Sequence, residues 1–385
     1  MIPYGRQDIS QADIDAVIQV LKSDFLTQGS QVPAFEQALA NKVGAQHAVA
    51  VNSATSALHL ACLALGLTQG DWLWTSPITF VASANCALYC GAQVDFVDID
   101  PQTYNLCANK LEEKLLQAKA ENRLPKIVIP VHFAGQSCNM QRIYQLSQEY
   151  GFKIIEDASH AIGGQYQGQY IGHCQYSDIC VFSFHPVKII TTAEGGMATT
   201  NQSALAEKMH LLRSHGITRD PQAMTHLPDG PWYYQQIDLG FNYRMTELQA
   251  ALGLSQLTRL DEFVKKRRML AQHYNQAFSG TNFTCPYQDE ETYSAFHLYP
   301  IQLCLEKLKK THIDIFSELK SAGIGVNLHY IPVHMQPYYK QKGFNRGDFP
   351  IAEAYYSKVI SLPLFPSMTQ AQIDKIVSSV KNIVI

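Results

Sequence analysis

Short apolar runs alternate with amphipathic segments along the first two thirds of the chain. Runs of this length, bounded by turn residues, are typical of buried strands. They predict strands at 47–51, 72–75, 94–97, 127–131, 152–155, 179–184 and 196–200. Helical spacing of apolar residues predicts intervening helices at 55–65 and 140–149. This alternation favours a mostly parallel sheet that is covered by helices on both faces.

Two helices are predicted before this alternation. Ser10 fits the N-cap of the first, with Asp13 at the third position. The second is expected over 33–43 and ends before Gly44, a residue type that commonly terminates helices.

A different pattern follows the last predicted strand of the sheet. The leucine-rich stretch 245–278 predicts one long helix that leads into a smaller C-terminal lobe. In that lobe the pattern predicts strands at 299–304 and 325–328 and helices at 313–322 and 370–383. We therefore expect a large α/β domain with an N-terminal arm over 1–259 and a small α+β domain over 260–385.

Composition and charge narrow the class of protein. Of the 385 residues, 46% are hydrophobic and 16% are charged, which excludes a disordered chain or a coiled coil. A net charge of -3 without a basic run argues against nucleic acid as a partner. We find no signal peptide and no apolar stretch of membrane-spanning length, so we expect a cytoplasmic protein that does not enter a membrane. Nine cysteines without a CxxC pair argue against a metal site or a disulfide framework.

The residues with candidate chemistry follow the predicted strands. Lys188 comes directly after the strand at 179–184, as expected of a lysine that forms a Schiff base. Asp157 lies at the C-terminal end of the strand predicted at 152–155, two residues beyond it, where ligands of open α/β sheets bind, and its carboxylate suits a pyridinium nitrogen. Taken alone, Lys188 also fits a solvated loop and Asp157 a turn cap.

Two further positions fit a phosphorylated aromatic cofactor. The small hydroxyl residues at 53–56 open a predicted helix, and the free N–H groups of a helix N-terminus bind phosphate. Phe80 follows the next strand and suits stacking on a pyridine ring. Considered singly, these residues are equally compatible with an ordinary helix cap and with core packing. Their order along the chain carries the inference.

In this order the sequence resembles the fold-type I, pyridoxal-phosphate-dependent sugar aminotransferases of the DegT/DnrJ/EryC1/StrS family. The resemblance spans nearly the whole chain and lies in GSQVPAFE at 29–36, NSATSAL at 52–58, EDASHAIG at 156–163, SFHPVK at 183–188 and GFNYRMTE at 240–247. It implies an aspartate aminotransferase-like fold and pyridoxal phosphate (PLP) as the cofactor. Ala193 departs from the glycine of many relatives but removes no catalytic group.

The resemblance implies a role for each matching residue. Lys188, Asp157 and His160 are the implied catalytic residues, with His160 beside the phenolic oxygen of the cofactor. The implied cofactor-binding set is Ala54, Thr55, Phe80, Asp157, Ser183, Lys188, Asn242 and Arg244. The implied substrate-binding set is Tyr4, Asp24, Phe25, Leu26, Thr27, Thr55, His185, Asn242, His329 and Tyr330. Asn242 and Arg244 are expected to reach the neighbouring subunit, which implies a homodimer with shared active sites.

The loops at 1–7, 24–29, 329–334 and 337–339 further resemble those of family members on the route to pseudaminic acid. This implies transfer of the amino group of L-glutamate to C4 of UDP-2-acetamido-2,6-dideoxy-β-L-arabino-hexos-4-ulose. The alternatives are another nucleotide-linked keto-sugar, of the UDP-D-xylo or dTDP series, and a non-catalytic PLP-binding regulatory protein.

Two other enzyme classes fit the sequence less well. Lys188 argues against the related dehydratases, which have histidine there. The missing GxGxxG after the first strands argues against an NAD oxidoreductase.

Overall fold

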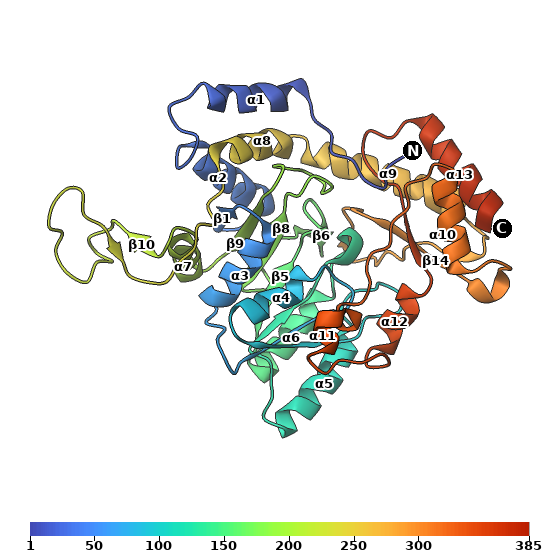
Figure 1. Cartoon of the computed structure of the whole chain (residues 1–385), viewed down its shortest axis with the longest axis horizontal. Coiled ribbons are helices and arrows are strands. Elements are labelled where there is room, and N and C mark those ends of the chain that lie inside the picture. The colour runs from blue at the N-terminus through green and yellow to red at the C-terminus, as the bar shows by residue number, and fades with distance from the viewer. Residues whose placement is uncertain (385) are drawn as a thin grey trace.

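A seven-stranded sheet forms the centre of the computed structural model, which describes residues 1–384 (Figure 1). Its strand order is β1 (His47–Val51), β9 (Gly196–Thr200), β8 (Ile179–Ser183), β5 (Lys153–Asp157), β4 (Ile127–Ile129), β2 (Trp72–Thr75) and β3 (Gln93–Phe96). The neighbours from β3 to β8 are parallel, whereas β9 runs antiparallel to both β8 and β1. The predicted mostly parallel α/β sheet is thus confirmed.

Helices cover both faces of the sheet. Alternate residues of β2 point to opposite faces, so that Leu73 packs with α3, α4 and α7 and Trp74 packs with α5 and α6. The bounds are α3 (Ala54–Ala64), α4 (Ala82–Tyr89), α7 (Ser203–Arg213), α5 (Ala108–Ala120) and α6 (Met140–Tyr150). The sequence analysis placed no element over α4, α5 or α7.

The two N-terminal helices lie as predicted, with small shifts. Helix α1 (Gln11–Leu21) begins with a capping box in which Ser10 and Asp13 each accept a hydrogen bond from the other's backbone N–H. Helix α2 (Gln31–Val43) begins two residues before the predicted start and ends at Gly44, which adopts the left-handed conformation (φ +79°).

The predicted helix over 245–278 is wrong in one respect, because it is two helices, α8 (Glu247–Leu257) and α9 (Leu260–Ala277). Arg259 lies at the break with φ −103° and ψ 5°. Its guanidinium donates to Asp8 at 2.8 Å and also to Asp13. Through these bonds Arg259 links the N-terminal arm to the junction of α8 and α9.

The predicted strand over 325–328 is also wrong. Instead of continuous pairing the segment makes isolated contacts: the Gly325 N–H donates to the carbonyl of Ile2, which forms a single parallel bridge with Ile324. One isolated bridge, Asn327 with Ser361, remains. The small sheet is instead β12 (Phe283–Thr284), β14 (Tyr299–Leu303) and β15 (Val359–Leu362).

The C-terminal part has its own apolar core, built from α9, β14, β15, α10 (His312–Ser321) and α13 (Gln370–Val384). Ile2 of the arm also packs into this core. The division at 259/260 stays a prediction.

The remaining short elements are β6 (Gln165–Tyr166), β7 (Gln169–Tyr170), β13 (Thr292–Tyr293), α11 (Pro337–Lys340), α12 (Pro350–Tyr356) and the 3-10 turns Phe133–Gly135, Leu305–Lys307 and Val333–Met335.

The segment between α7 and α8 projects from the body of the molecule as a long loop around β10 (Ile217–Thr218) and β11 (Gln235–Gln236) (Figure 1). It exposes apolar side chains, including Leu227 and Trp232. Across residues 1–384, no helix combines the length and apolar character needed to span a membrane.

Candidate active site

A cavity of about 630 Å³ opens at the carboxyl ends of the central strands. Asp157 is the last residue of β5 and Ser183 the last residue of β8, as expected for a ligand site of an open α/β sheet. The predicted residues that line the cavity are Tyr4, Ala54, Thr55, Phe80, Asp157, His160, Ser183, His185, Lys188, His329 and Tyr330. Folding thus brings together segments from both ends of the chain.

Lys188 enters this cavity from the segment between β8 and β9. Its amine has no hydrogen-bond or ion-pair partner within residues 1–384. Burial lowers the pKa of Lys188 to about 8, against the opposing effect of the Asp157 carboxylate. The neutral, nucleophilic form of this amine is consequently more populated near neutral pH than it is for an exposed lysine.

The Asp157 carboxylate is held by two donors. Ser83 Oγ donates to Oδ2 at 2.6 Å, and the backbone N–H of Ser159 donates to Oδ1 at 3.1 Å. The Ser83 hydroxyl also lies 2.7 Å from Thr79 Oγ1. Because these side chains are buried, the carboxylate has one fixed orientation. Ser83 was not predicted from the sequence, because the bond joins residues 74 positions apart.

The N-terminus of α3 forms another wall of the cavity. Ser53 Oγ accepts a hydrogen bond from the N–H of Ser56, whereas no acceptor in residues 1–384 bonds to the N–H groups of Ala54 and Thr55. Gly196 passes so close that a Cβ there would lie 2.5 Å from the Ala54 nitrogen. The missing side chain keeps this N-terminus in place as an anion cradle.

His160 and Tyr330 share a hydrogen bond whose direction follows from a third group. The backbone N–H of Ala134 donates to Nδ1 of His160 at 3.3 Å, and burial keeps the pKa of His160 well below its usual value. The ring is therefore neutral and carries its one proton on Nε2, which donates to Tyr330 Oη at 3.0 Å. The Tyr330 proton is then free to point into the cavity.

His329 is fixed in the same way on the adjacent wall. The Asn327 amide donates to Nε2 at 3.4 Å, so Nδ1 carries the proton and donates to Ser361 Oγ at 2.8 Å. Burial lowers the pKa of His329 to about 3, which keeps its ring neutral. His297, which the sequence analysis missed, packs its ring 4.5 Å from that of His160 and also lines the cavity.

Some predicted residues do not line the cavity of their own chain. These are Asp24, Phe25, Leu26, Thr27, Asn242 and Arg244. Phe25 and Leu26 are exposed apolar side chains. The segment that contains Asn242 lies against the turn before α3, because its backbone carbonyl accepts from Asn52 Nδ2 at 3.4 Å. Residues 24–27 and Asn242 are therefore exposed in the single chain, and Arg244 is half-buried.

The features of this cavity fit pyridoxal phosphate. A free amine, an oriented carboxylate and unbonded N–H groups at a helix N-terminus match its aldehyde, its pyridine nitrogen and its phosphate. The aromatic ring of Phe80 supplies an apolar face. Asp157, Lys188, Ala54 and Thr55 would hold these parts of the cofactor.

Comparison with known proteins gives a concordant result. The sequence profile of the DegT/DnrJ/EryC1/StrS aminotransferase family matches residues 7–381. A Campylobacter jejuni UDP-4-amino-4,6-dideoxy-N-acetyl-beta-L-altrosamine transaminase is 39% identical over 96% of this chain and 93% of its own length. The structure is similar to Helicobacter pylori PseC, an aminotransferase involved in the biosynthesis of pseudoaminic acid, with TM-score 0.90 and 34% identity over 100% and 99% of the two chains. The structure is also similar to that of Spr1654, a putative sugar aminotransferase from Streptococcus pneumoniae, in its PMP form. The TM-score is 0.90, and the two sequences are 29% identical over 100% of this chain and 99% of the other.

Proposed function

The chain belongs to the DegT/DnrJ/EryC1/StrS aminotransferase family, and on that premise we propose that it transfers the amino group of L-glutamate to C4 of UDP-2-acetamido-2,6-dideoxy-β-L-arabino-hexos-4-ulose. The observation that carries the proposal is the meeting of Lys188, Asp157 and the α3 N-terminus in one cavity. Each group alone fits an ordinary structural role, whereas together they fit one cofactor.

The cofactor is pyridoxal phosphate, which when bound accepts electrons from the carbon that loses a proton. Asp157 keeps the pyridine nitrogen protonated, and Ser83 fixes the carboxylate in the orientation that this requires. Ala54, Thr55 and Ser183 would bind the phosphate, and Phe80 would pack on the ring. Lys188 would hold the aldehyde group.

Lys188 also moves protons. Its amine lies in the cavity that would hold the cofactor, and a pKa near 8 would let it both take and return a proton at neutral pH. The Tyr330 hydroxyl donates a hydrogen bond toward the sugar's keto oxygen, because His160 already fills its acceptor side. Burial raises the pKa of Tyr330, so this donor stays protonated.

Two features support a homodimer with shared sites. Asn242 and Arg244 lie at the surface beside the turn that opens α3, and neither lines the cavity of its own chain. Phe25 and Leu26 present apolar surface that a second copy would bury. In the proposed dimer, Asn242 and Arg244 complete the partner's cavity.

The substrate assignment draws on the names of the two relatives from Campylobacter and Helicobacter, together with the loops at 24–29 and 329–334. The test supplies the purified enzyme with L-glutamate and UDP-linked β-L-arabino, UDP-linked D-xylo or dTDP-linked 4-keto-sugars, and measures the amino-sugar by mass spectrometry. The β-L-arabino substrate should give the highest kcat/KM. Preference for the D-xylo epimer or a dTDP-sugar would contradict the proposed substrate but not the aminotransferase activity. A lack of turnover with every keto-sugar would contradict the proposed activity itself.

A further inference from the structure

The imidazole of His297 lies in the wall of the catalytic cavity, and its side chain is 4% exposed. Among residues 1–384 no group bonds to either of its ring nitrogens. Nδ1 is fully enclosed by the protein, whereas Nε2 is not, so Nε2 is the nitrogen that a ligand can reach. His160, by contrast, already uses both of its ring nitrogens within the chain.

The ring of His297 is neutral. Burial first, and then positive groups that include Lys188 and Arg267, keep the pKa of His297 well below its usual value. A neutral imidazole carries one N–H, and an enclosed N–H without an acceptor is the less favourable arrangement. The proton therefore belongs on Nε2, and His297 presents a hydrogen-bond donor to the cavity.

The backbone around His297 fixes the direction of this donor. The carbonyl oxygen of His297 accepts from Arg267 Nη1 at 3.2 Å. Gly135 packs so closely that a Cβ there would lie 3.0 Å from the His297 nitrogen and 3.0 Å from the His160 carbonyl oxygen. The rings of His160 and His297 lie 4.5 Å apart. A donor held in this way loses little freedom when it binds a ligand.

Arg267 places an unpaired positive charge behind His297. The side chain is 1% exposed, and its Nη1 donates to the carbonyl oxygens of Phe296, His297 and Leu364. Burial lowers the pKa of Arg267 to about 9, and no acidic group in residues 1–384 opposes this effect. The guanidinium nevertheless keeps its charge at neutral pH.

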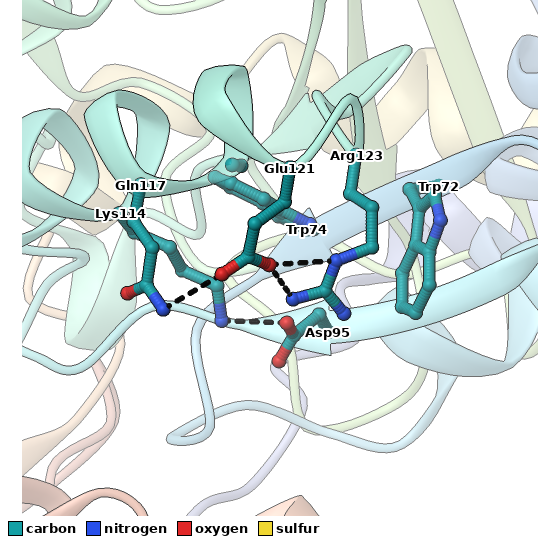
Figure 2. Close-up of a pocket in the computed structure, with 8 residues that line it drawn as sticks. Trp72, Trp74, Asp95, Lys114, Gln117, Glu121 and Arg123 are labelled. Carbon is teal, nitrogen blue, oxygen red and sulfur yellow. Dashed lines mark hydrogen bonds and ion pairs between the residues drawn. The ribbon is translucent and has the colours of Figure 1, made fainter.

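The cleft beneath α5 shows the arrangement that Arg267 lacks. There Lys114 Nζ donates to Asp95 Oδ2 at 2.7 Å, and Arg123 Nε donates to Glu121 Oε2 at 2.9 Å (Figure 2). A buried charge without such a partner is unfavourable. Because the charge of Arg267 acts on the nearby imidazole of His297, it would also attract an anion bonded to that imidazole.

The place of Lys188 indicates which anion this is. Its amine also lies near enough to lower the pKa of His297, and no carboxylate is among the charged groups that act on this ring. In the proposed reaction the nitrogen of the amino donor takes the place of the Lys188 amine. One carbon separates that nitrogen from the donor's α-carboxylate. The diphosphate of a nucleotide-sugar is farther from the reacting carbon, because the sugar ring lies between them.

We propose that Nε2 of His297 donates a hydrogen bond to the α-carboxylate of the amino donor. This inference rests on the proposed function and names the contact that holds L-glutamate in the first half-reaction. The keto-sugar carries no carboxylate, so the sugar half-reaction does not require this bond.

The probe for this contact is 2-methylglutamate, which has both carboxylates of the donor but no α-proton to lose. It is titrated into the PLP-loaded enzyme without any sugar, and the absorbance of the bound cofactor reports its attachment. His297→Met should weaken the affinity by about tenfold, the contribution of one hydrogen bond to a charged group. His297→Gln keeps an N–H near the position of Nε2 and should bind more tightly than His297→Met.

Two further measurements locate the contact. His297→Met should weaken the binding of 2-methylglutamine by the same factor, because this compound keeps the α-carboxylate and has an amide in place of the side-chain carboxylate. The half-saturating concentration of L-glutamate should rise by a similar factor. The limiting rate of that half-reaction, and the rate of the sugar half-reaction, should stay close to those of the unaltered enzyme.

Unchanged affinity of His297→Met for 2-methylglutamate would overturn the inference. Equal losses in His297→Met and His297→Gln would also overturn it, as would a loss confined to 2-methylglutamate, which would place the contact on the side-chain carboxylate. An unaltered enzyme that binds no 2-methylglutamate would contradict the proposed glutamate donor together with this inference. Since no sugar is present in the titrations, an error in the proposed sugar substrate leaves their outcome unchanged.

Discussion

Nε2 of His160 donates its proton to the hydroxyl oxygen of Tyr330, because the backbone N–H of Ala134 already occupies the other ring nitrogen. The histidine therefore acts on the cavity through the tyrosine. Tyr330, whose proton remains free, becomes the donor that faces the substrate. This relationship assigns distinct tasks to two side chains that the sequence placed 170 residues apart.

Tyr330→Phe should slow the sugar half-reaction by about 10²-fold, because removal of a positioned donor costs roughly this much. The glutamate half-reaction should proceed at a near-normal rate. Each half-reaction is followed separately by the absorbance of the bound cofactor. Tyr287→Phe, at an exposed tyrosine outside the cavity, is the matched control. Equal slowing of both half-reactions by Tyr330→Phe would contradict the role of Tyr330 as a hydrogen-bond donor to the sugar.

His329→Ala should likewise impair mainly the sugar half-reaction. Its ring is neutral and fixed by Asn327 and Ser361, so its removal takes away part of the cavity wall rather than a proton carrier. The rate of this half-reaction should keep the pH profile of the unaltered enzyme. A new ionisation in that profile would show that His329 titrates during turnover.

The pH dependence of cofactor attachment should follow the ionisation of the Lys188 amine. Burial lowers its pKa to about 8, so the amine loses its proton at a lower pH than an exposed lysine, and the attacking neutral form increases as the pH rises through 8. The rate of covalent PLP attachment to the apoenzyme should therefore rise with a midpoint near pH 8. Borohydride reduction followed by peptide mapping identifies the labelled residue, and Lys188→Ala should take up no label. A midpoint near the ordinary lysine value of about 10.4 would argue against a buried Lys188 amine.

Mixing two inactive variants tests the shared sites. Lys188→Ala and Arg244→Ala, combined under conditions of subunit exchange, form a heterodimer in which one site carries both lesions and the other carries neither. About half of the activity of a normal dimer should return in this heterodimer. Mass spectrometry under native conditions establishes the exchange. Proven exchange without recovery would exclude a shared site.

Ala193→Gly should stabilise the protein. Ala193 has φ +66°, a left-handed conformation that costs a residue with a Cβ about 1 kcal/mol relative to glycine. This left-handed conformation explains why many relatives have glycine at this position. Thermal unfolding of the cofactor-free protein measures the gain. Ala354→Gly, at an exposed position inside α12, serves as the control and should destabilise by about 0.5–1 kcal/mol. A loss of stability in Ala193→Gly would refute the strain argument.

The sequence by itself determined the large sheet and the residues at the ends of its strands. Strands β1 and β2 have the predicted bounds, because a buried strand needs an apolar run that is visible locally. Asp157 and Lys188 were predictable for a related reason. The carboxyl ends of parallel strands meet at one edge, so position along the chain already indicates which side chains converge.

Only the tertiary structure decided the contacts between distant segments. Ser83 holds Asp157 across 74 residues, and no local pattern encodes that pairing. Arg259, at the break between α8 and α9, bonds to Asp8 of the N-terminal arm, and the Gly325 N–H bonds to Ile2 of the same arm. Each of these hydrogen bonds joins segments far apart in the sequence, and a hydrogen bond contributes about as much free energy as the helix or strand preference of one residue, so local patterns do not reveal it.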